Sequence, residues 1–239
     1  MGIETETRAA RGVAPPLASL GHTVALVGVM LAVAVSGTLL QASAPAAASG
    51  ARGSSTVGRI AGQYLPLLLV NGLLVLYVTR LFRTRNVLPQ LLGRRWSSPR
   101  DVLTDLLYAS LTYLLIVTLE ALTQALFAGR NAAVSTLLPG TEAERLTWLF
   151  VAVTVGFCEE VVYRGYLQTQ LSAFTRSTLL GVVLQSLLFG LAHLEQGVGS
   201  ALRIGGYGLL LGALARHRGS LLPGMVCHIS IDLASGLLR

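Results

Sequence analysis

Residues 146–164 read LTWLFVAVTVGFCEEVVYR, an apolar run that ends in two glutamates and an arginine. An apolar helix of about 20 residues is long enough to cross the hydrocarbon core of a bilayer. An ionised side chain in the middle of such a helix costs about 2.5–3.5 kcal/mol even on the more lenient insertion scale. The stretch therefore predicts a membrane-spanning helix whose charged groups have a specific role.

Apolar runs of similar character occur along the rest of the chain. They cover residues 20–40, 64–82, 103–127, 178–193, 201–214 and 221–238, in addition to 146–162. Only 12% of the residues are charged and 53% are hydrophobic, whereas a soluble domain has about 25% charged residues. The sequence thus predicts an all-α fold, a polytopic transmembrane helical bundle with about seven spans, within a range of six to eight.

The net charge of +7 comes from arginines in the short loops between apolar runs, where membrane proteins carry them. This placement argues against nucleic acid as a partner and in favour of membrane lipids. The densest positive loop joins the second and third runs and contains Arg83, Arg85, Arg94, Arg95 and Arg100. Because positive loops stay inside the cell, we expect this loop and the N-terminal tail, residues 1–18, on the cytoplasmic side of the cell membrane.

Glu160 and Arg164 are four residues apart, which places them on one face of a helix and predicts an ion pair. Glu159 is turned about 100° away from that face and lacks this partner. One glutamate is therefore occupied, and the other is available for chemistry. A pair of this kind can also serve only to hold helices together, so the sequence leaves a structural role open.

Two further helices carry residues of interest at the same four-residue spacing. Phe189 and His193 share a face near the end of one apolar run, and His228 and Asp232 share a face in the last run. A histidine and a carboxylate at this spacing can form a hydrogen bond that fixes the histidine tautomer. A lone membrane histidine is as often a packing residue as a catalyst. Polar groups on three helices, however, are costly unless they converge.

The three motifs together resemble the CAAX prenyl endopeptidase and bacteriocin-processing proteins, the CPBP or ABI family. The family pattern is Glu-Glu-x-x-x-Arg, then Phe-x-x-x-His, then His-x-x-x-Asn or Asp, on successive helices. This chain matches the pattern in order with Glu159, Glu160, Arg164, Phe189, His193, His228 and Asp232. The resemblance implies an intramembrane endopeptidase that hydrolyses membrane-associated peptides or proteins, prenylated or not.

The resemblance also implies roles for individual residues. In the glutamate-type mechanism, the residue matching Glu159 acts with the one matching His193 to activate water, and those matching His228 and Asp232 stabilise the oxyanion. An ionised aspartate cannot donate a hydrogen bond as asparagine does. We therefore expect Asp232 to orient His228 and to stabilise its cationic form, as the carboxylate does in a serine-protease triad.

The sequence leaves open whether the reaction uses a metal. Members of the family are described both as glutamate-type peptidases, which need no cofactor, and as metalloproteases. Glu159, His193 and His228 offer one carboxylate and two imidazoles, an ordinary catalytic zinc set. Two other kinds of protein also stay open: a non-catalytic immunity or binding protein, and an ion or proton transporter.

These interpretations divide the chain into three parts. We expect residues 1–18 to form the tail, residues 19–144 the N-terminal scaffold helices, and residues 145–239 the catalytic core. The residues expected to support the core are Glu160, Arg164 and Phe189.

The expected helix ends conflict with this site. A fourth helix that ends near residue 162 and a fifth that runs from 178 to 193 would place Glu159 and His193 at different depths. We therefore expect residues 164–177 to dip partly into the bilayer, so that the fifth span begins later.

Overall fold

The computed structural model describes residues 15–43, 55–80, 87–126 and 138–238. Across these ranges the regular structure is helical, and the one β-type pairing is an isolated bridge between Gly93 and Ser220. The predicted all-α class is confirmed. The tail up to residue 14 and the loop arginines Arg83 and Arg85 lie outside the described residues.

Five described helices are long and apolar enough to cross a membrane. They are α2 (Leu20–Ser43), the continuous α3–η2–α4 (Thr56–Arg59, Ile60–Tyr64, Leu65–Arg80), α6 (Pro99–Leu126), the continuous α8–η3–α9 (Glu142–Glu159, Glu160–Leu167, Gln168–Thr175) and α11 (Val198–Arg218). Two shorter apolar helices are α10 (Thr178–Leu191) and α12 (Leu222–Leu237). The chain is therefore a multi-pass membrane protein, and the seven predicted apolar runs all form helices. The short α5 (Val87–Leu92) and η4 (Leu194–Gln196) have no counterpart in the prediction.

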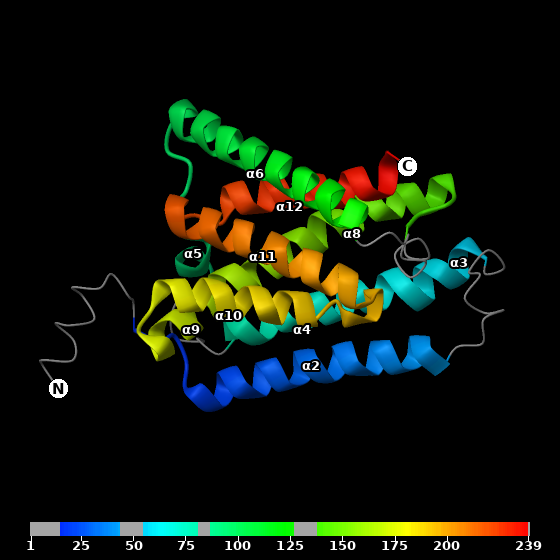
Figure 1. The fold of residues 1–239 in the computed structure, drawn as a ribbon, viewed down its shortest axis with the longest axis horizontal. Helices are drawn as coiled ribbons and strands as arrows, with labels where there is room; N and C mark the ends of the chain where they lie inside the picture. Colours follow the sequence, from blue (N-terminus) through cyan, green and yellow to red (C-terminus); the bar gives the residue numbers. More distant parts are fainter. Residues whose placement is uncertain (1–14, 44–54, 81–86, 127–137, 239) are drawn as a thin grey trace, which may run out of the picture.

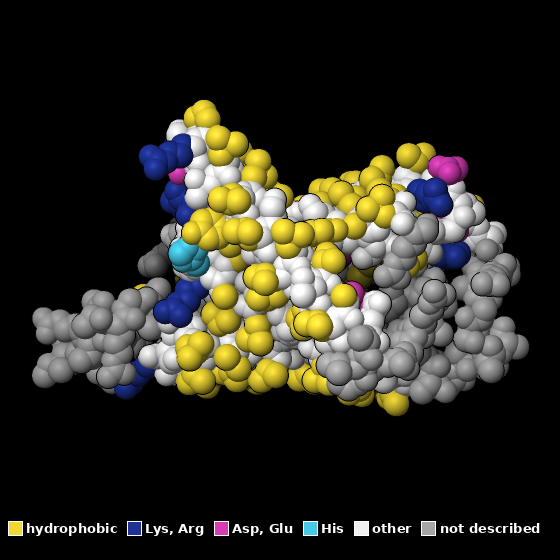
Figure 2. Space-filling view, turned by 45° about the horizontal axis from the view of Figure 1, so that its top comes forward, with side chains coloured by type: hydrophobic (Ala, Val, Ile, Leu, Met, Phe, Trp, Pro, Cys, Tyr) yellow, Lys and Arg dark blue, Asp and Glu magenta, His cyan; other side chains and the backbone are white. Residues whose placement is uncertain are grey.

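The helices run side by side, with α2 on one flank and α6 on the other (Figure 1). Between them α10 packs on α9 and α11, while α12 packs on α8 and α6. Apolar side chains cover the middle of the visible surface, and charged side chains gather at its two ends (Figure 2). This distribution is the one that a bilayer imposes, because only the ends of the helices reach water and lipid headgroups.

The fourth span does not end near residue 162, as its sequence pattern predicts, but continues as one helix to Thr175. The prediction was wrong because polar residues in this stretch suggested a loop, whereas their side chains are buried and bonded to other helices. Gln170 is fully buried and bonds to residues at the start of α2, including Thr23 at 2.8 Å. Gln168 donates to the carbonyl of Gly212 in α11 at 3.1 Å. The fifth helix begins at residue 178, where its apolar run begins, and the expected later start is wrong.

Glycines bring α10 and α11 into close contact. A Cβ atom at Gly190 would lie 2.5 Å from the Ala201 carbonyl oxygen, and one at Gly208 would lie 2.8 Å from the Ser186 Cβ. Gly219 turns the chain between α11 and α12 in the left-handed region, at φ +58°. Ser220 directly follows this turn, and its hydroxyl accepts from the Leu222 N–H at 3.2 Å.

Candidate active site

The length of the fourth helix brings the polar motifs to one level. From Glu159 to Thr175 the helix advances about 24 Å, and α10 returns about 20 Å from Thr178 to Leu191, at about 1.5 Å per residue. His193 follows two residues later and so lies at a depth similar to that of Glu159. The conflict expected from the shorter helix is therefore resolved by the continuation of the helix from Tyr163 to Thr175, and not by a later start of the fifth span.

The second glutamate forms the ion pair that its spacing predicts. The Oε1 atom of Glu160 lies 3.0 Å from a terminal nitrogen of Arg164, and both side chains have no exposed surface. These residues belong to η3, a π-helical stretch in which every residue is buried. The guanidinium carbon of Arg164 lies 4.2 Å from the centre of the Phe189 ring, within the range of a cation–π contact.

Phe189 contacts residues from all three motifs. Its ring makes edge contacts with Tyr163 at 4.8 Å, His193 at 4.9 Å and His228 at 5.9 Å between ring centres. Both imidazoles therefore lie against one buried phenyl ring, with the arginine on the same ring. The polar groups of the three helices therefore converge, as their cost in a membrane led us to expect.

His228 is surrounded by carboxylates. Its Nδ1 lies 2.9 Å from Oε1 of Glu160, while its Nε2 lies 3.6 Å from Oε2 of Glu159 and 3.8 Å from Oδ2 of Asp232. The sequence led us to expect that Asp232 orients this histidine. The structure differs, because Nδ1 donates the hydrogen bond that fixes the ring to Glu160 on another helix, and Asp232 lies beyond hydrogen-bond distance.

His193 is held by its own helix. Its Nδ1 lies 2.8 Å from the carbonyl oxygen of Phe189. A carbonyl oxygen only accepts, so Nδ1 donates this hydrogen bond, and Nε2 is the ring nitrogen left for another partner. Among the described residues, His193 forms no hydrogen bond or ion pair with Glu159, and its ring contacts that of Phe189.

Two features of the site were missed from the sequence. Gly224 lies one turn before His228, and a Cβ atom there would come within 2.9 Å of Oε2 of Glu160. Trp148 donates its indole N–H to the main-chain carbonyl of Asp232 at 2.8 Å. The sequence does not reveal either feature, because Gly224 acts across the contact of α12 with η3, and Trp148 acts across the contact of α8 with α12.

The zinc set considered from the sequence was tested against this arrangement. Within the described part of the chain, no three His, Cys, Asp or Glu side chains are grouped so that they could hold a metal ion. Glu159 and His228 approach each other, but His193 does not join them in such a group. Within these residues the geometry does not fit a three-residue metal centre.

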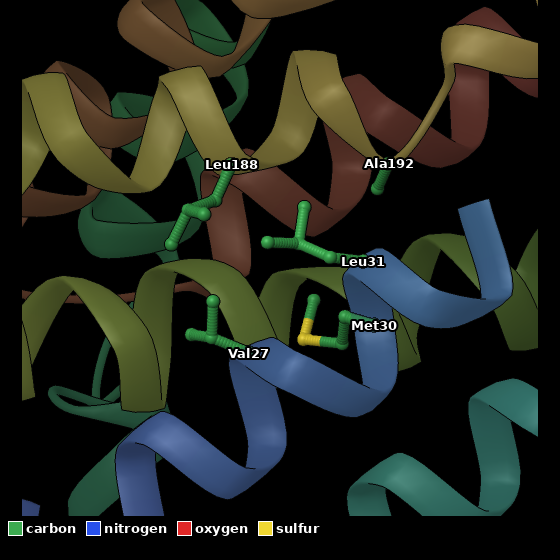
Figure 3. A pocket seen from close by; sticks show the side chains of 5 residues that line it. All are labelled: Val27, Met30, Leu31, Leu188 and Ala192. Carbon is green, nitrogen blue, oxygen red and sulfur yellow. The ribbon is translucent and has the colours of Figure 1, made fainter. Parts of the chain in front are cut away.

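An apolar crevice lies between α2 and α10 (Figure 3). It is lined by Val27, Met30 and Leu31 of α2, by Leu188 of α10 and by Ala192 directly after α10. Ala192 directly precedes His193, so the crevice lies beside the site. Its lining offers hydrocarbon contacts only and no group for the chemistry itself.

Residues 141–234 match the family model described as type II CAAX prenyl endopeptidase Rce1-like. The matched region contains the seven motif residues and the helices that bring them together. No curated protein and no solved structure shows a match to the chain. The family that the three motifs resembled is confirmed, and residues 141–234 are a domain of the Rce1-like type II CAAX prenyl endopeptidase family.

Proposed function

We propose that the protein is an intramembrane endopeptidase that hydrolyses peptide bonds in membrane-associated peptides or proteins. The observation that carries this proposal is the approach of Glu159 to His228, 3.6 Å apart, beside the buried Glu160–Arg164 pair. The family of the domain is one of endopeptidases, and the helices that carry the site are apolar enough to lie in a bilayer. A carboxylate and imidazoles in such a place suit acid–base catalysis.

In this proposal, Glu159 and His193 activate the attacking water. Glu159 is the glutamate not used in the ion pair, and with Nδ1 as the donor to Phe189, the Nε2 atom of a neutral His193 is a second proton acceptor. The water gives its proton to this pair as its oxygen attacks the carbonyl carbon of the substrate. The same proton then passes to the leaving nitrogen as the carbon–nitrogen bond breaks.

His228 stabilises the oxyanion of the tetrahedral intermediate. Glu160 accepts a hydrogen bond from Nδ1, and this bond aims the other nitrogen of the ring, Nε2, at Glu159 and Asp232. The negative charge of Asp232 stabilises a cationic ring, so Nε2 carries a proton. The Nε2–H group donates a hydrogen bond to the developing negative oxygen. A donor of this kind contributes about 3–4 kcal/mol to the stabilisation of a transition state.

Arg164 and Phe189 support this arrangement without touching the substrate. Arg164 balances the charge of Glu160, and Phe189 separates the arginine from the two histidines while fixing the planes of both rings. We also keep the three-part division of the chain, with residues 145–239 as the catalytic core.

The substrate has to reach a site within the helices. Its class is a peptide or membrane protein, and the apolar side chains between α2 and α10 lie beside His193. We place the enzyme in the cell membrane with its arginine-rich loops on the cytoplasmic side, where Arg94, Arg95 and Arg100 are exposed residues that suit anionic lipids. The basic charge serves this orientation and not the binding of nucleic acid.

The test compares peptides released from membranes of cells that carry wild-type protein or Glu159→Gln. The amide keeps the size of the side chain but does not accept the proton of water, so we expect release of the wild-type-dependent peptides to fall by about 100-fold or more. Peptides are measured by mass spectrometry, and the inserted protein is quantified in the same membranes.

The matched control is Glu142→Gln, the same change at the start of the same helix, where the side chain is 88% exposed. This variant should release peptides as the wild type does. Undiminished release by an inserted, folded Glu159→Gln protein would contradict the proposal and favour a non-catalytic binding role.

A further inference from the structure

Trp148 joins α8 to α12 next to the candidate site. Its indole N–H donates to the main-chain carbonyl of Asp232 at 2.8 Å. In an α-helix that carbonyl already receives the N–H of residue 236, and its second lone pair is free for another donor. The indole thus bonds to the backbone of the residue whose side chain faces His228.

Gly236 makes room for the indole. A Cβ atom at this position would overlap Trp148, and the three atoms nearest to it all belong to the indole ring, with Cε2 at 2.7 Å. From the other side, the ring of Tyr64 packs edge-on against the indole, 5.7 Å between centres. The indole is therefore fixed between the backbone of α12 and a buried tyrosine of η2.

The position of Trp148 on its helix links this contact to the site. Eleven residues separate Trp148 from Glu159, which is close to three full turns, so both side chains leave α8 on the same face. Between them, a Cβ atom at Gly156 would lie 2.7 Å from a side-chain carbon of Ile229. The two helices are therefore in contact at three successive points along α8, at Trp148, at Gly156 and at Glu159, which approaches His228.

We propose that Trp148 is a positioning residue that sets the height of α12 against α8, and thereby the place of Asp232 and His228 beside Glu159. The contact at Gly156 is packing against Ile229 and not a directional bond, so it tolerates a small slide. The indole hydrogen bond does not, because it has one acceptor. The inference rests on the proposed function, since the geometry that it protects is that of the proposed catalytic groups.

The test uses the full chain in detergent micelles with ¹⁵N-labelled histidine. Trp148→Phe keeps an aromatic ring beside Tyr64 but removes the N–H donor, and Gly236→Ala pushes the indole away from α12. We expect both variants to shift the ¹⁵N signals of His228, assigned from a His228→Asn sample, while those of His22 and His217 stay in place.

Peptide release from membranes should fall together with this shift. A misplacement of about 1 Å in a catalytic constellation costs on the order of 100-fold in rate, so we expect a loss of about 10-fold to 100-fold for Trp148→Phe. The double variant Trp148→Phe with Gly236→Ala should be no worse than Trp148→Phe alone, because the smaller ring leaves space for the added methyl group.

The matched control is Trp96→Phe. The other tryptophan of the chain also donates its N–H, to Asp105 at 3.0 Å, and it lies in the loop before α6. This variant should leave the His228 signals in place and peptide release within about twofold of wild type. Unchanged His228 signals in folded Trp148→Phe and Gly236→Ala samples would overturn the inference.

The two proposals fail in different ways. If Glu159→Gln releases the same peptides as wild type, the proposed function is wrong whatever Trp148 does. If Glu159→Gln is inactive while Trp148→Phe keeps wild-type release and wild-type His228 signals, the function stands and the positioning role of Trp148 is wrong.

Discussion

The first three spans and the C-terminal helices bury their residues to different degrees. In the most apolar windows of α2, α3–α4 and α6, 22%, 11% and 22% of the residues are buried, against 50% in α8–η3–α9 and 39% in α11. Burial against lipid gives helices no hydrophobic reason to associate, so close packing and polar contacts hold them together. The C-terminal helices have both, whereas the first three mainly present apolar side chains outward. The same chemical change should therefore cost far more in the C-terminal region than in the first three spans.

The largest contrast is expected between two arginines. Arg164→Ala would leave Glu160 buried without its cation and Phe189 without its cation–π partner. Breaking a buried pair in this way costs about 3–5 kcal/mol. Arg94 pairs with Asp101 at 2.7 Å, but its side chain is 43% exposed, so Arg94→Ala should cost about 1 kcal/mol or less.

The measurement is the unfolding free energy of both variants in the same detergent. Arg164→Lys serves as an intermediate, because it restores the charge without the planar guanidinium that stacks on the ring. Equal losses for Arg164→Ala and Arg94→Ala would show that the buried cluster does not stabilise the C-terminal region as argued.

The Glu160–Arg164 pair also marks what could be predicted from the sequence. Both partners lie on one helix, so their spacing alone fixes the contact, and the seven apolar runs follow in the same way from composition. The hydrogen bond from His228 to Glu160 could not be predicted, because it spans 68 residues and depends on the register of two helices. Residue spacing pointed to Asp232 instead, the acid nearest along the chain.

The end of the fourth helix was mispredicted for a related reason. Gln168 and Gln170 look like loop residues in a linear reading, since polarity along the chain does not reveal whether a partner is present. In the fold each amide finds a partner on another helix, Gly212 in α11 and Thr23 in α2 respectively. Buried amides that form hydrogen bonds to neighbouring helices are compatible with a membrane interior. The hydropathy of the sequence does not reveal these bonds.

A smaller contrast is expected between two glycines. Gly190→Ala would place a methyl group 2.5 Å from the Ala201 carbonyl oxygen and 3.1 Å from the Gly205 Cα, both backbone atoms that cannot move aside singly. Overpacking of this kind costs about 1–3 kcal/mol. At Gly28 in α2 a methyl group would meet nothing within 4 Å, and Gly28→Ala should stabilise the helix by about 0.5–1 kcal/mol.

The two alanine variants are compared by thermal unfolding under identical conditions, with Gly72→Ala as a second open position in α4. A loss at Gly28 as large as that at Gly190 would mean that α2 packs as tightly as the C-terminal helices, and the contrast between the two regions would disappear.

The smallest effect concerns the far end of α2, where the two regions meet. A Cβ atom at Gly37 would lie 3.6 Å from the Cβ of Glu195, which follows His193 in η4. Disulfides join Cβ atoms about 3.5–4.5 Å apart, so the pair Gly37→Cys with Glu195→Cys should cross-link under mild oxidation with little change in unfolding temperature. The native Cys158 and Cys227 are buried and stay reduced.

Cross-linking is followed by the mobility of the protein on a gel after a single protease cut between α2 and η4. The control pair Gly28→Cys with Glu195→Cys should stay unlinked, since nothing lies within 4 Å of a side chain at Gly28. Equal cross-linking of the two pairs would show that α2 slides along the site and is not held at Gly37. Cross-linking of the Gly37 pair alone would show that the lightly buried α2 has one defined contact beside His193, at the opposite end from its hydrogen bonds to Gln170. The first region would then be fixed to the second at two points, with the lipid-facing stretch between them.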